Sequence, residues 1–413
     1  MSFKRLVIFF LAILYILHDM PMLGYRYPSV VYALIIISLF LILSFDVGIK
    51  TLLKILPIFI IPLLNVFISS VSAYEIFQGI SRFLQFLILP LLAIYIYEWE
   101  DLKMAKILFL TVIGVNIITC ITTYNGCLMY PEASRHLAAG DASTALYYYV
   151  YLSANIGGFK FIYNTVLISG LVIYTLMNFR NIKGGYFLLP ISILYLVIII
   201  MTLLAAEYTL SLLMFVSYIF LIFVRGNFHI KKFFVLGAFV ILLFFLFKPF
   251  ISSGLKSVSE ITKSENVANR VYDLHLKLEG KHSQDNSDFD ARKDAYIKSL
   301  EQFKKTPFGS WKYIGIGGGH SFVLDTLARY GLIGLILMII TYVYVYRYYI
   351  KPYDGDEIFG YSFYIYFLFF IMSVLNPHIF TDTIMFVLPL YTFIFQEESY
   401  DYDETVENDV PLY

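Results

Sequence analysis

Charged residues are scarce in this 413-residue chain, because Asp, Glu, Lys and Arg make up 15% of it whereas hydrophobic residues make up 59%. Soluble domains carry about a quarter of charged residues, so the composition excludes an ordinary soluble enzyme. The 30 basic and 30 acidic residues cancel, and no block of Lys or Arg occurs. Both facts argue against a nucleic-acid partner.

Cysteine is almost absent as well. Cys120 and Cys127 are the only two, too few for a disulfide framework or for a zinc site of their own. We expect them to be structurally neutral, with a local disulfide as the alternative.

What the chain does contain is a series of apolar runs near the roughly 20-residue length that crosses a bilayer as a helix. The sequence therefore predicts an all-α polytopic membrane protein with about twelve transmembrane helices, forming a single transmembrane domain over residues 1–396. The predicted helices lie near residues 5–18, 28–46, 52–71, 80–98, 105–124, 159–178, 185–204, 207–225, 232–251, 320–346, 358–376 and 378–396.

The positions of the basic residues predict the orientation, because cytoplasmic loops are enriched in Lys and Arg. The short loops on the opposite side offer little beyond Arg26 and Arg82. Both termini are thus expected in the cytoplasm, and residues 397–413 are expected to form an acidic, disordered cytoplasmic tail. The basic side gathers Lys4, Arg5, Lys50, Lys54, Lys103, Lys106, Arg180, Lys183, Arg225, Lys231, Lys232, Arg347 and Lys351.

Two loops are too long to be turns, residues 124–158 and residues 252–319, and the predicted orientation places both outside the membrane. Long loops in compact proteins commonly bind or gate. The second loop separates the ninth and tenth helices, and its Ala295, Leu300 and Phe303 recur at helical spacing before Pro307. This spacing predicts a short amphipathic helix lying on the membrane surface.

A glycine-rich segment joins this loop to the tenth helix. Gly317, Gly318 and Gly319 permit tight turns, and His320 and Ser321 follow where the helix begins. The N–H groups of a helix start suit an anion, although an entry turn with an interfacial histidine explains the same residues. A nucleotide-binding loop is excluded because no strand precedes the glycines.

Ionisable residues inside or beside the helices are the other candidates for chemistry. Asp325 and Arg329 lie four residues apart in the tenth helix, a spacing that favours an ion pair, yet charge within a span is by default a functional hypothesis. Each loop arginine could grip a phosphate through its planar fork, with a solvated surface position as the alternative. These arginines are Arg135, Arg270 and Arg292; Glu207, His378 and Asp382 lie in short outer turns, where simple exposure is the favoured interpretation.

Several of these residues together form a recognisable set. Arg292, the run AYIKSLEQFKKTPFG at 295–309, Gly315 and Gly317, His320 with Ser321, Asp325 and the run Gly331 to Gly334 resemble the O-antigen and capsular polysaccharide polymerases. The O-antigen ligases are related to that family.

The resemblance implies a GT-C-like, metal-independent inverting glycosyltransferase that needs no cofactor. Its donor would be a polyprenyl-diphosphate-linked oligosaccharide at the outer face of the bacterial cytoplasmic membrane. Arg135 and Arg292 would hold the diphosphate, with Arg270 as the fallback. His320 would contact either the acceptor hydroxyl, as the catalytic base, or the phosphate, in which case Glu207, Asp325 or Asp382 would take the place of the base. A flippase and a chain-length regulator are the expected protein partners.

Two alternatives remain open. A ligase would transfer the chain to a different acceptor. A flippase or exporter of the same lipid-linked sugar should show paired halves and midplane charges, whereas the suggestive residues of this chain gather on one side.

Overall fold

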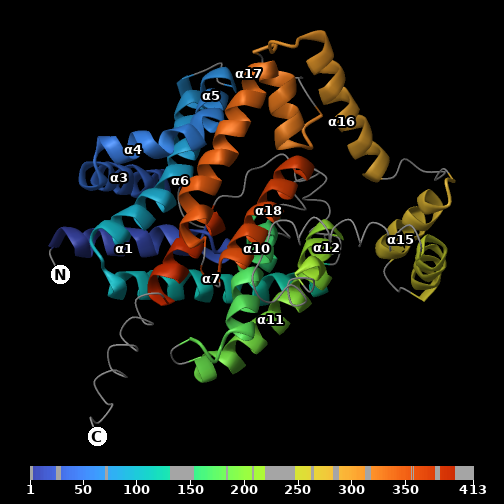
Figure 1. The fold of residues 1–413 in the computed structure, drawn as a ribbon, viewed down its shortest axis with the longest axis horizontal. Coiled ribbons are helices and arrows are strands. Elements are labelled where there is room, and N and C mark those ends of the chain that lie inside the picture. The colour runs from blue at the N-terminus through green and yellow to red at the C-terminus, as the bar shows by residue number, and fades with distance from the viewer. Residues whose placement is uncertain are drawn as a thin grey trace, which may run out of the picture.

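The computed structural model describes residues 3–24, 29–69, 73–130, 153–182, 185–206, 209–218, 247–261, 265–281, 288–311, 318–354, 356, 358–376 and 382–395 (Figure 1). Across these residues, all regular structure is helical. Seven helices are long and apolar enough to cross a membrane. Among the described residues, the structure is therefore all-helical and consistent with a polytopic membrane protein, while the twelve spans and the large loop between the ninth and tenth helices stay predictions.

The helices follow one another in a simple order. Before the first long loop come α1 (Phe3–His18), α2 (Pro21–Gly24), α3 (Ser29–Val47), α4 (Ile49–Ile55), η1 (Leu56–Phe59), α5 (Ile60–Ser69), α6 (Ala73–Glu98) and α7 (Leu102–Met129). After it come α10 (Phe159–Met177), α11 (Gly185–Ala206), α12 (Thr209–Ser217), α15 (Glu265–Leu278), α16 (Asp288–Lys305), α17 (Phe322–Val345), η3 (Tyr346–Ile350), η4 (Lys351–Tyr353), α18 (Phe359–Leu375) and η5 (Thr383–Val387).

Most predicted spans coincide with these helices. The predicted span at 52–71 is interrupted by a 3₁₀ turn at Pro57, which cannot donate a backbone hydrogen bond. The last two spans are shorter apolar helices, Phe359–Leu375 and Thr383–Phe395. Of the spans at 207–225 and 232–251, only residues 209–218 and 247–251 belong to the described part of the chain, so these two predictions remain open.

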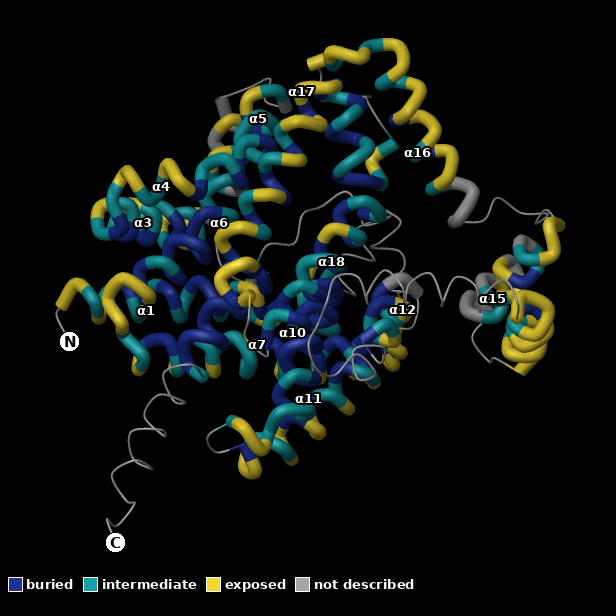
Figure 2. Tube along the Cα trace, in the orientation of Figure 1, coloured by how far each residue is buried: buried dark blue, intermediate teal, exposed yellow. Residues whose placement is uncertain are grey.

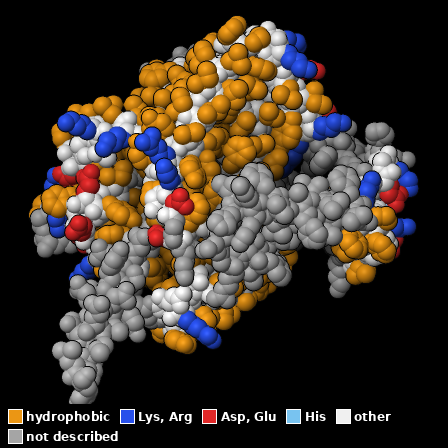
Figure 3. Space-filling model, in the orientation of Figure 1, with side chains coloured by type: hydrophobic (Ala, Val, Ile, Leu, Met, Phe, Trp, Pro, Cys, Tyr) orange, Lys and Arg blue, Asp and Glu red, His pale blue; other side chains and the backbone are white. Residues whose placement is uncertain are grey.

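The centre of the bundle is α10. Twelve of its residues are buried, and it packs against α11, α12 and α18. Figure 2 shows the dark, buried core around α10 and the exposed surfaces of α15 and α16 at the periphery. Hydrophobic side chains cover a broad outer face over α5 and α17 (Figure 3), as expected for a surface in contact with lipid.

Contacts between helices define two ends of the bundle. At the basic end, Lys4 pairs with Asp46, and the Arg5 guanidinium lies 4.3 Å from the centre of the Trp99 ring. At the opposite end, which we call the entry end, the N–H of Phe322 donates to the carbonyl of Asn376 at 2.7 Å. This contact joins the start of α17 to the end of α18.

The helix α17 is not the single straight span predicted for residues 320–346. Its backbone leaves the helical region at Gly331 (φ 62°, ψ −144°). A Cβ on Gly334 would lie 2.8 Å from the carbonyl oxygen of Thr326, whereas eight residues of a straight helix rise about 12 Å. The two parts of α17 therefore fold back on each other at Gly331, a break that the prediction of one helix over residues 320–346 did not include.

Candidate functional site

The entry to α17 is closed by a helix cap. The hydroxyl oxygen of Ser321 accepts a hydrogen bond from the N–H of Leu324 at 3.1 Å, as an N-cap serine does. Ser321 is fully buried. The prediction that the helix begins at this serine is confirmed.

The carboxylate of Asp325 organises the loop in front of that cap. Its Oδ1 accepts from the Ser299 hydroxyl at 2.7 Å and from the N–H groups of Gly318 and Gly319 at 3.1 and 3.3 Å. Its Oδ2 accepts from the N–H of Ser321 at 3.3 Å. Asp325 is 4% exposed, so these donors replace the water that a buried carboxylate would otherwise need.

The anion at this helix start is therefore Asp325 itself. The sequence suggested that N–H groups after the glycines would face a substrate anion, but those of Gly318, Gly319 and Ser321 bind the Asp325 carboxylate. No ion pair joins Asp325 to Arg329 among the described residues, so the i,i+4 pairing was not the correct interpretation. Asp325 is a positioning residue for the loop that carries His320.

The helix α16 packs onto this loop through small side chains. Ala295 and Ser299 are buried, and a Cβ on Gly318 would lie 2.2 Å from the carbonyl oxygen of Ala295. Leu300, which the spacing assigned to the apolar face, is 40% exposed, and neighbouring Ile297 is 42% exposed. The predicted helix exists, but its packing face is set by close backbone approach to the loop rather than by its large apolar residues.

A second set of hydrogen bonds holds α17 at its break near Gly331. The Leu332 N–H donates to the Pro307 carbonyl at 2.8 Å, and the N–H groups of Ser310 and Trp311 donate to the Arg329 carbonyl at 2.9 and 3.1 Å. A Cβ on Gly331 would lie 2.1 Å from the Pro307 oxygen. The Pro-Phe-Gly turn thus fits into the break in α17, which joins two motifs that are more than twenty residues apart in the sequence.

His320 and Arg292 lie near each other above this scaffold, and both side chains are half-buried. Burial lowers the pKa of the His320 imidazole, the Arg292 guanidinium lowers it further, and Asp325 opposes both effects. Neighbouring Tyr296 donates its hydroxyl to the Leu375 carbonyl at 3.2 Å, which ties α16 to α18. The arrangement places an imidazole whose pKa is lowered beside a permanent positive charge.

The other predicted site residues are not brought into this group by the described structure. Arg135, Glu207, Gly317 and His378 lie outside the described residues, and so does the tail at 397–413. Arg270 belongs to α15, with its side chain outside the described part. Cys120 and Cys127 are buried and form no disulfide, so the alternative of a local disulfide is wrong.

A second polar group, which sequence reasoning largely missed, lies at the start of α10. Lys160 pairs with Asp382 at 2.6 Å, and the Asn164 amide donates to the same carboxylate oxygen at 3.2 Å. The favoured interpretation of Asp382 as an exposed turn residue is wrong, because its side chain is 16% exposed and ion-paired. A lone lysine just after Gly157 and Gly158, at the head of an apolar helix, was the available signal.

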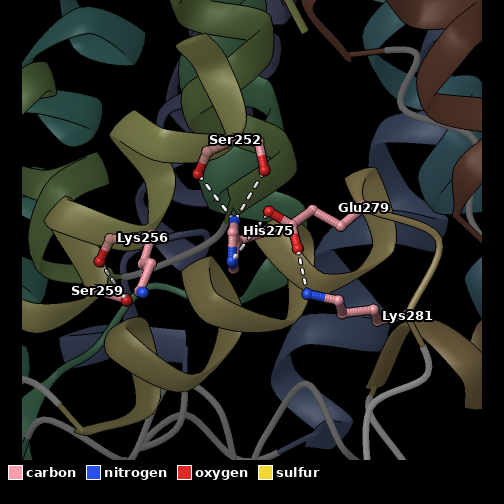
Figure 4. Close-up of polar contacts among 6 residues, drawn as sticks. All are labelled: Ser252, Lys256, Ser259, His275, Glu279 and Lys281. Atoms are coloured by element: carbon pink, nitrogen blue, oxygen red, sulfur yellow. Dashed lines mark hydrogen bonds and ion pairs between the residues drawn. The ribbon is translucent and has the colours of Figure 1, made fainter. Parts of the chain in front are cut away.

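The periphery carries a third polar group in the hairpin formed by residues 247–261 and α15 (Figure 4). His275 Nδ1 lies 2.8 Å from the Ser252 hydroxyl and 2.9 Å from the Ser252 carbonyl oxygen, and its Nε2 lies 3.7 Å from Glu279. Ser252 and His275 are 5% and 7% exposed. Such buried groups join the two helices of the hairpin and present no accessible nucleophile.

Comparisons of the chain with protein-family models, with curated proteins and with solved structures give no match. The functional argument therefore depends on the geometry around His320 and on the motif resemblance of the residues that build it.

Proposed function

We propose that the protein is a polysaccharide polymerase, a membrane glycosyltransferase that joins polyprenyl-diphosphate-linked oligosaccharide repeat units. The observation that carries the proposal is the position of Arg292 as an electrostatic neighbour of His320, on a loop that Asp325 holds. The pKa of His320 is lowered there. The interlock of Pro307 with Leu332 supports it, because the motif residues that resemble the polymerases are in mutual contact.

The proposed reaction is a direct displacement. A hydroxyl oxygen of the acceptor sugar attacks the anomeric carbon of the donor, and the bond from that carbon to the diphosphate oxygen breaks. Neutral His320 takes the proton of the attacking hydroxyl, as a general base near neutral pH does. Arg292 stabilises the charge that develops on the departing diphosphate.

The location of the reaction follows from the charge distribution. Lys4, Arg5 and Lys54 lie at or near the basic end, which the positive-inside rule assigns to the cytoplasm. The entry end would then face the outside of the bacterial membrane, where lipid-linked repeat units are exposed after a flippase moves them. No nucleotide sugar is required on that side.

The test is a chain-growth assay with purified protein in detergent and lipid-linked repeat units as the sole substrate. Wild-type protein should produce ladders of longer lipid-linked chains, and His320→Ala and Arg292→Ala should each lower the rate by at least about 100-fold. Arg347→Ala, which removes an exposed arginine beyond the end of α17, is the matched control and should retain the wild-type rate.

Three results would contradict the proposal. Chain growth that survives both substitutions would remove His320 and Arg292 from the mechanism. Folded wild-type protein that builds no chain but moves the lipid-linked sugar across reconstituted vesicles is an exporter, and transfer to a different acceptor without chain growth identifies a ligase.

A further inference from the structure

A cavity of about 430 Å³ opens beside the start of α10, between α1, α3, α6, α7 and the η5 segment. Its polar lining includes Asp19, Tyr32, Lys160, Asn164 and Asp382, together with His18, Gln85, Asn116 and Thr383. Apolar side chains, among them Leu89 and Val115, line the remainder. The volume lies within the range of small-molecule sites, roughly 300–1,000 Å³.

The charges in this cavity argue against an anionic ligand. Lys160 is the one cationic side chain among the described lining residues, because burial lowers the pKa of His18 to about 4, and Lys160 is held by Asp382 at 2.6 Å. The carboxylate of Asp19 adds a second negative charge within electrostatic reach of both. A phosphate or carboxylate entering here would meet two carboxylates and a lysine that is already compensated.

The available hydrogen-bonding atoms suit hydroxyl groups instead. Both contacts to the Asp382 carboxylate, from Lys160 and Asn164, fall on Oδ2, and no described residue hydrogen-bonds to Oδ1. The Asp19 carboxylate likewise has no hydrogen-bonding partner among the described residues. An ionised carboxylate can only accept, so the matching ligand presents several O–H donors.

The aromatic part of the lining suits a ring. Tyr32 stacks on His18 with 3.4 Å between ring centres and 9° between planes, which fixes a flat surface at the polar part of the cavity. Rigid aromatic faces bury the C–H face of a compact ring at little entropic cost. A neutral sugar has both features, because its ring presents a C–H face and carries several hydroxyl donors at its edge.

We propose that this cavity binds a neutral sugar ring, and that this ring is the terminal sugar of the acceptor; the second part rests on the proposed polymerase function. The helix α10 links the cavity to His320 and Arg292. Lys160 and Asn164 line the cavity, while Tyr163, one position away from Asn164, is an electrostatic neighbour of Arg292. An acceptor held here would lie beside the centre that activates its hydroxyl.

The test measures binding to the full-length protein in detergent without any donor. The probes are methyl α-glucoside and methyl α-galactoside as neutral sugars and sodium diphosphate as the anion, each followed by calorimetric titration. Asp382→Asn should weaken binding of the preferred glycoside about tenfold, since a charge-assisted hydrogen bond is replaced by a neutral one. Asp46→Asn is the matched control, because Asp46 also pairs with a lysine and is similarly shielded, at the other end of the bundle, and it should bind as wild type does.

Asn164→Ala provides a second variant if Asp382→Asn does not fold, and it should also weaken glycoside binding several-fold. Glycoside binding that is equal in wild type, Asp382→Asn and Asn164→Ala overturns the site. Wild-type protein that binds diphosphate but neither glycoside also overturns the site. Protein that binds a glycoside through Asp382 but builds no chain contradicts the polymerase proposal and leaves the sugar site standing.

Discussion

The two ends of the bundle each carry a lysine–aspartate pair, and exposure does not distinguish them. The side chains of Lys4 and Asp46 are 54% and 12% exposed, and those of Lys160 and Asp382 are 53% and 16% exposed. The surroundings differ. Asp382 also binds Asn164 and lines a cavity, whereas the pair at the basic end sits at the rim near Arg5 and Trp99.

This difference shows that the role of a charged pair in a membrane protein depends on the residues and cavities around it, and not on its exposure alone. Basic side chains at the cytoplasmic edge orient and anchor the helices. Pairs within the helical bundle are costly and tend to mark pathways or sites. The entry end contains the loop held by Asp325, the reversal in α17 and the polar cavity. A substitution in each of these features can be compared with a matched substitution at the basic end.

The largest expected effect is the loss of the α17 reversal in Gly331→Ala. Gly331 has φ +62° and its added Cβ would lie 2.1 Å from the Pro307 oxygen. Gly48 at the basic end has φ +79° with nothing within 4 Å of an added Cβ. Gly48→Ala should therefore cost only the backbone strain, about 1–3 kcal/mol.

Gly331→Ala should cost that strain and the clash together, roughly 4 kcal/mol or more. Thermal unfolding in detergent, with size-exclusion chromatography as a check of folding, measures both variants. Equal destabilisation of the two proteins would mean that the contact between Pro307 and Gly331 contributes nothing to stability.

Sequence reasoning recovers most of the helices because each long apolar run has to lie in the membrane, whatever its neighbours are. The reversal at Gly331 escapes it, since the close approach of Gly334 to Thr326 exists only after folding. The same limit applies to the site. The cap at Ser321 is local and predictable, whereas the pair of Lys160 and Asp382 joins residues more than 200 positions apart.

Asp325→Asn should destabilise the entry end by about 2 kcal/mol, because the carboxylate bonds to Ser299 and to three backbone N–H groups lose their charge assistance. Asp46→Asn at the basic end, which changes one partly exposed ion pair, should cost less than about 1 kcal/mol. Thermal unfolding compares the two variants directly. A smaller loss for Asp325→Asn than for Asp46→Asn would show that the loop is held by other contacts.

The pH dependence of His320 tests the electrostatics of the candidate site. Burial and Arg292 hold its pKa below the usual 6.5, so the imidazole should stay neutral from pH 8 to 6.5 and take up a proton only below that. The folded state consequently loses stability as the pH falls below 6.5, where the unfolded chain binds the proton more readily. The rate of chain growth should be flat above pH 6.5 and decline on the acid side.

Arg292→Gln removes one of the two causes, and the pKa of His320 should rise in this variant. Nuclear magnetic resonance of protein with labelled histidine, with the His320 signal assigned by its absence in His320→Gln, follows the titration even where chain growth is abolished. A His320 pKa above 6.5 in the wild type would contradict the lowered pKa. The same His320 pKa in wild type and in Arg292→Gln would show that Arg292 does not influence the imidazole.

The smallest expected effect belongs to Lys4→Met at the basic end. Its pair with Asp46 is more than half exposed on the lysine side, and exposed pairs contribute roughly 0–1 kcal/mol. The substitution should leave the free energy of unfolding and the binding of methyl glycosides nearly unchanged.

Lys160→Met should lower both the free energy of unfolding and the affinity for methyl glycosides, because it leaves the shielded carboxylate of Asp382 beside that of Asp19 without a compensating charge. Equal behaviour of the two lysine variants, in unfolding and in glycoside titration, would remove the distinction between an anchoring pair and a binding pair.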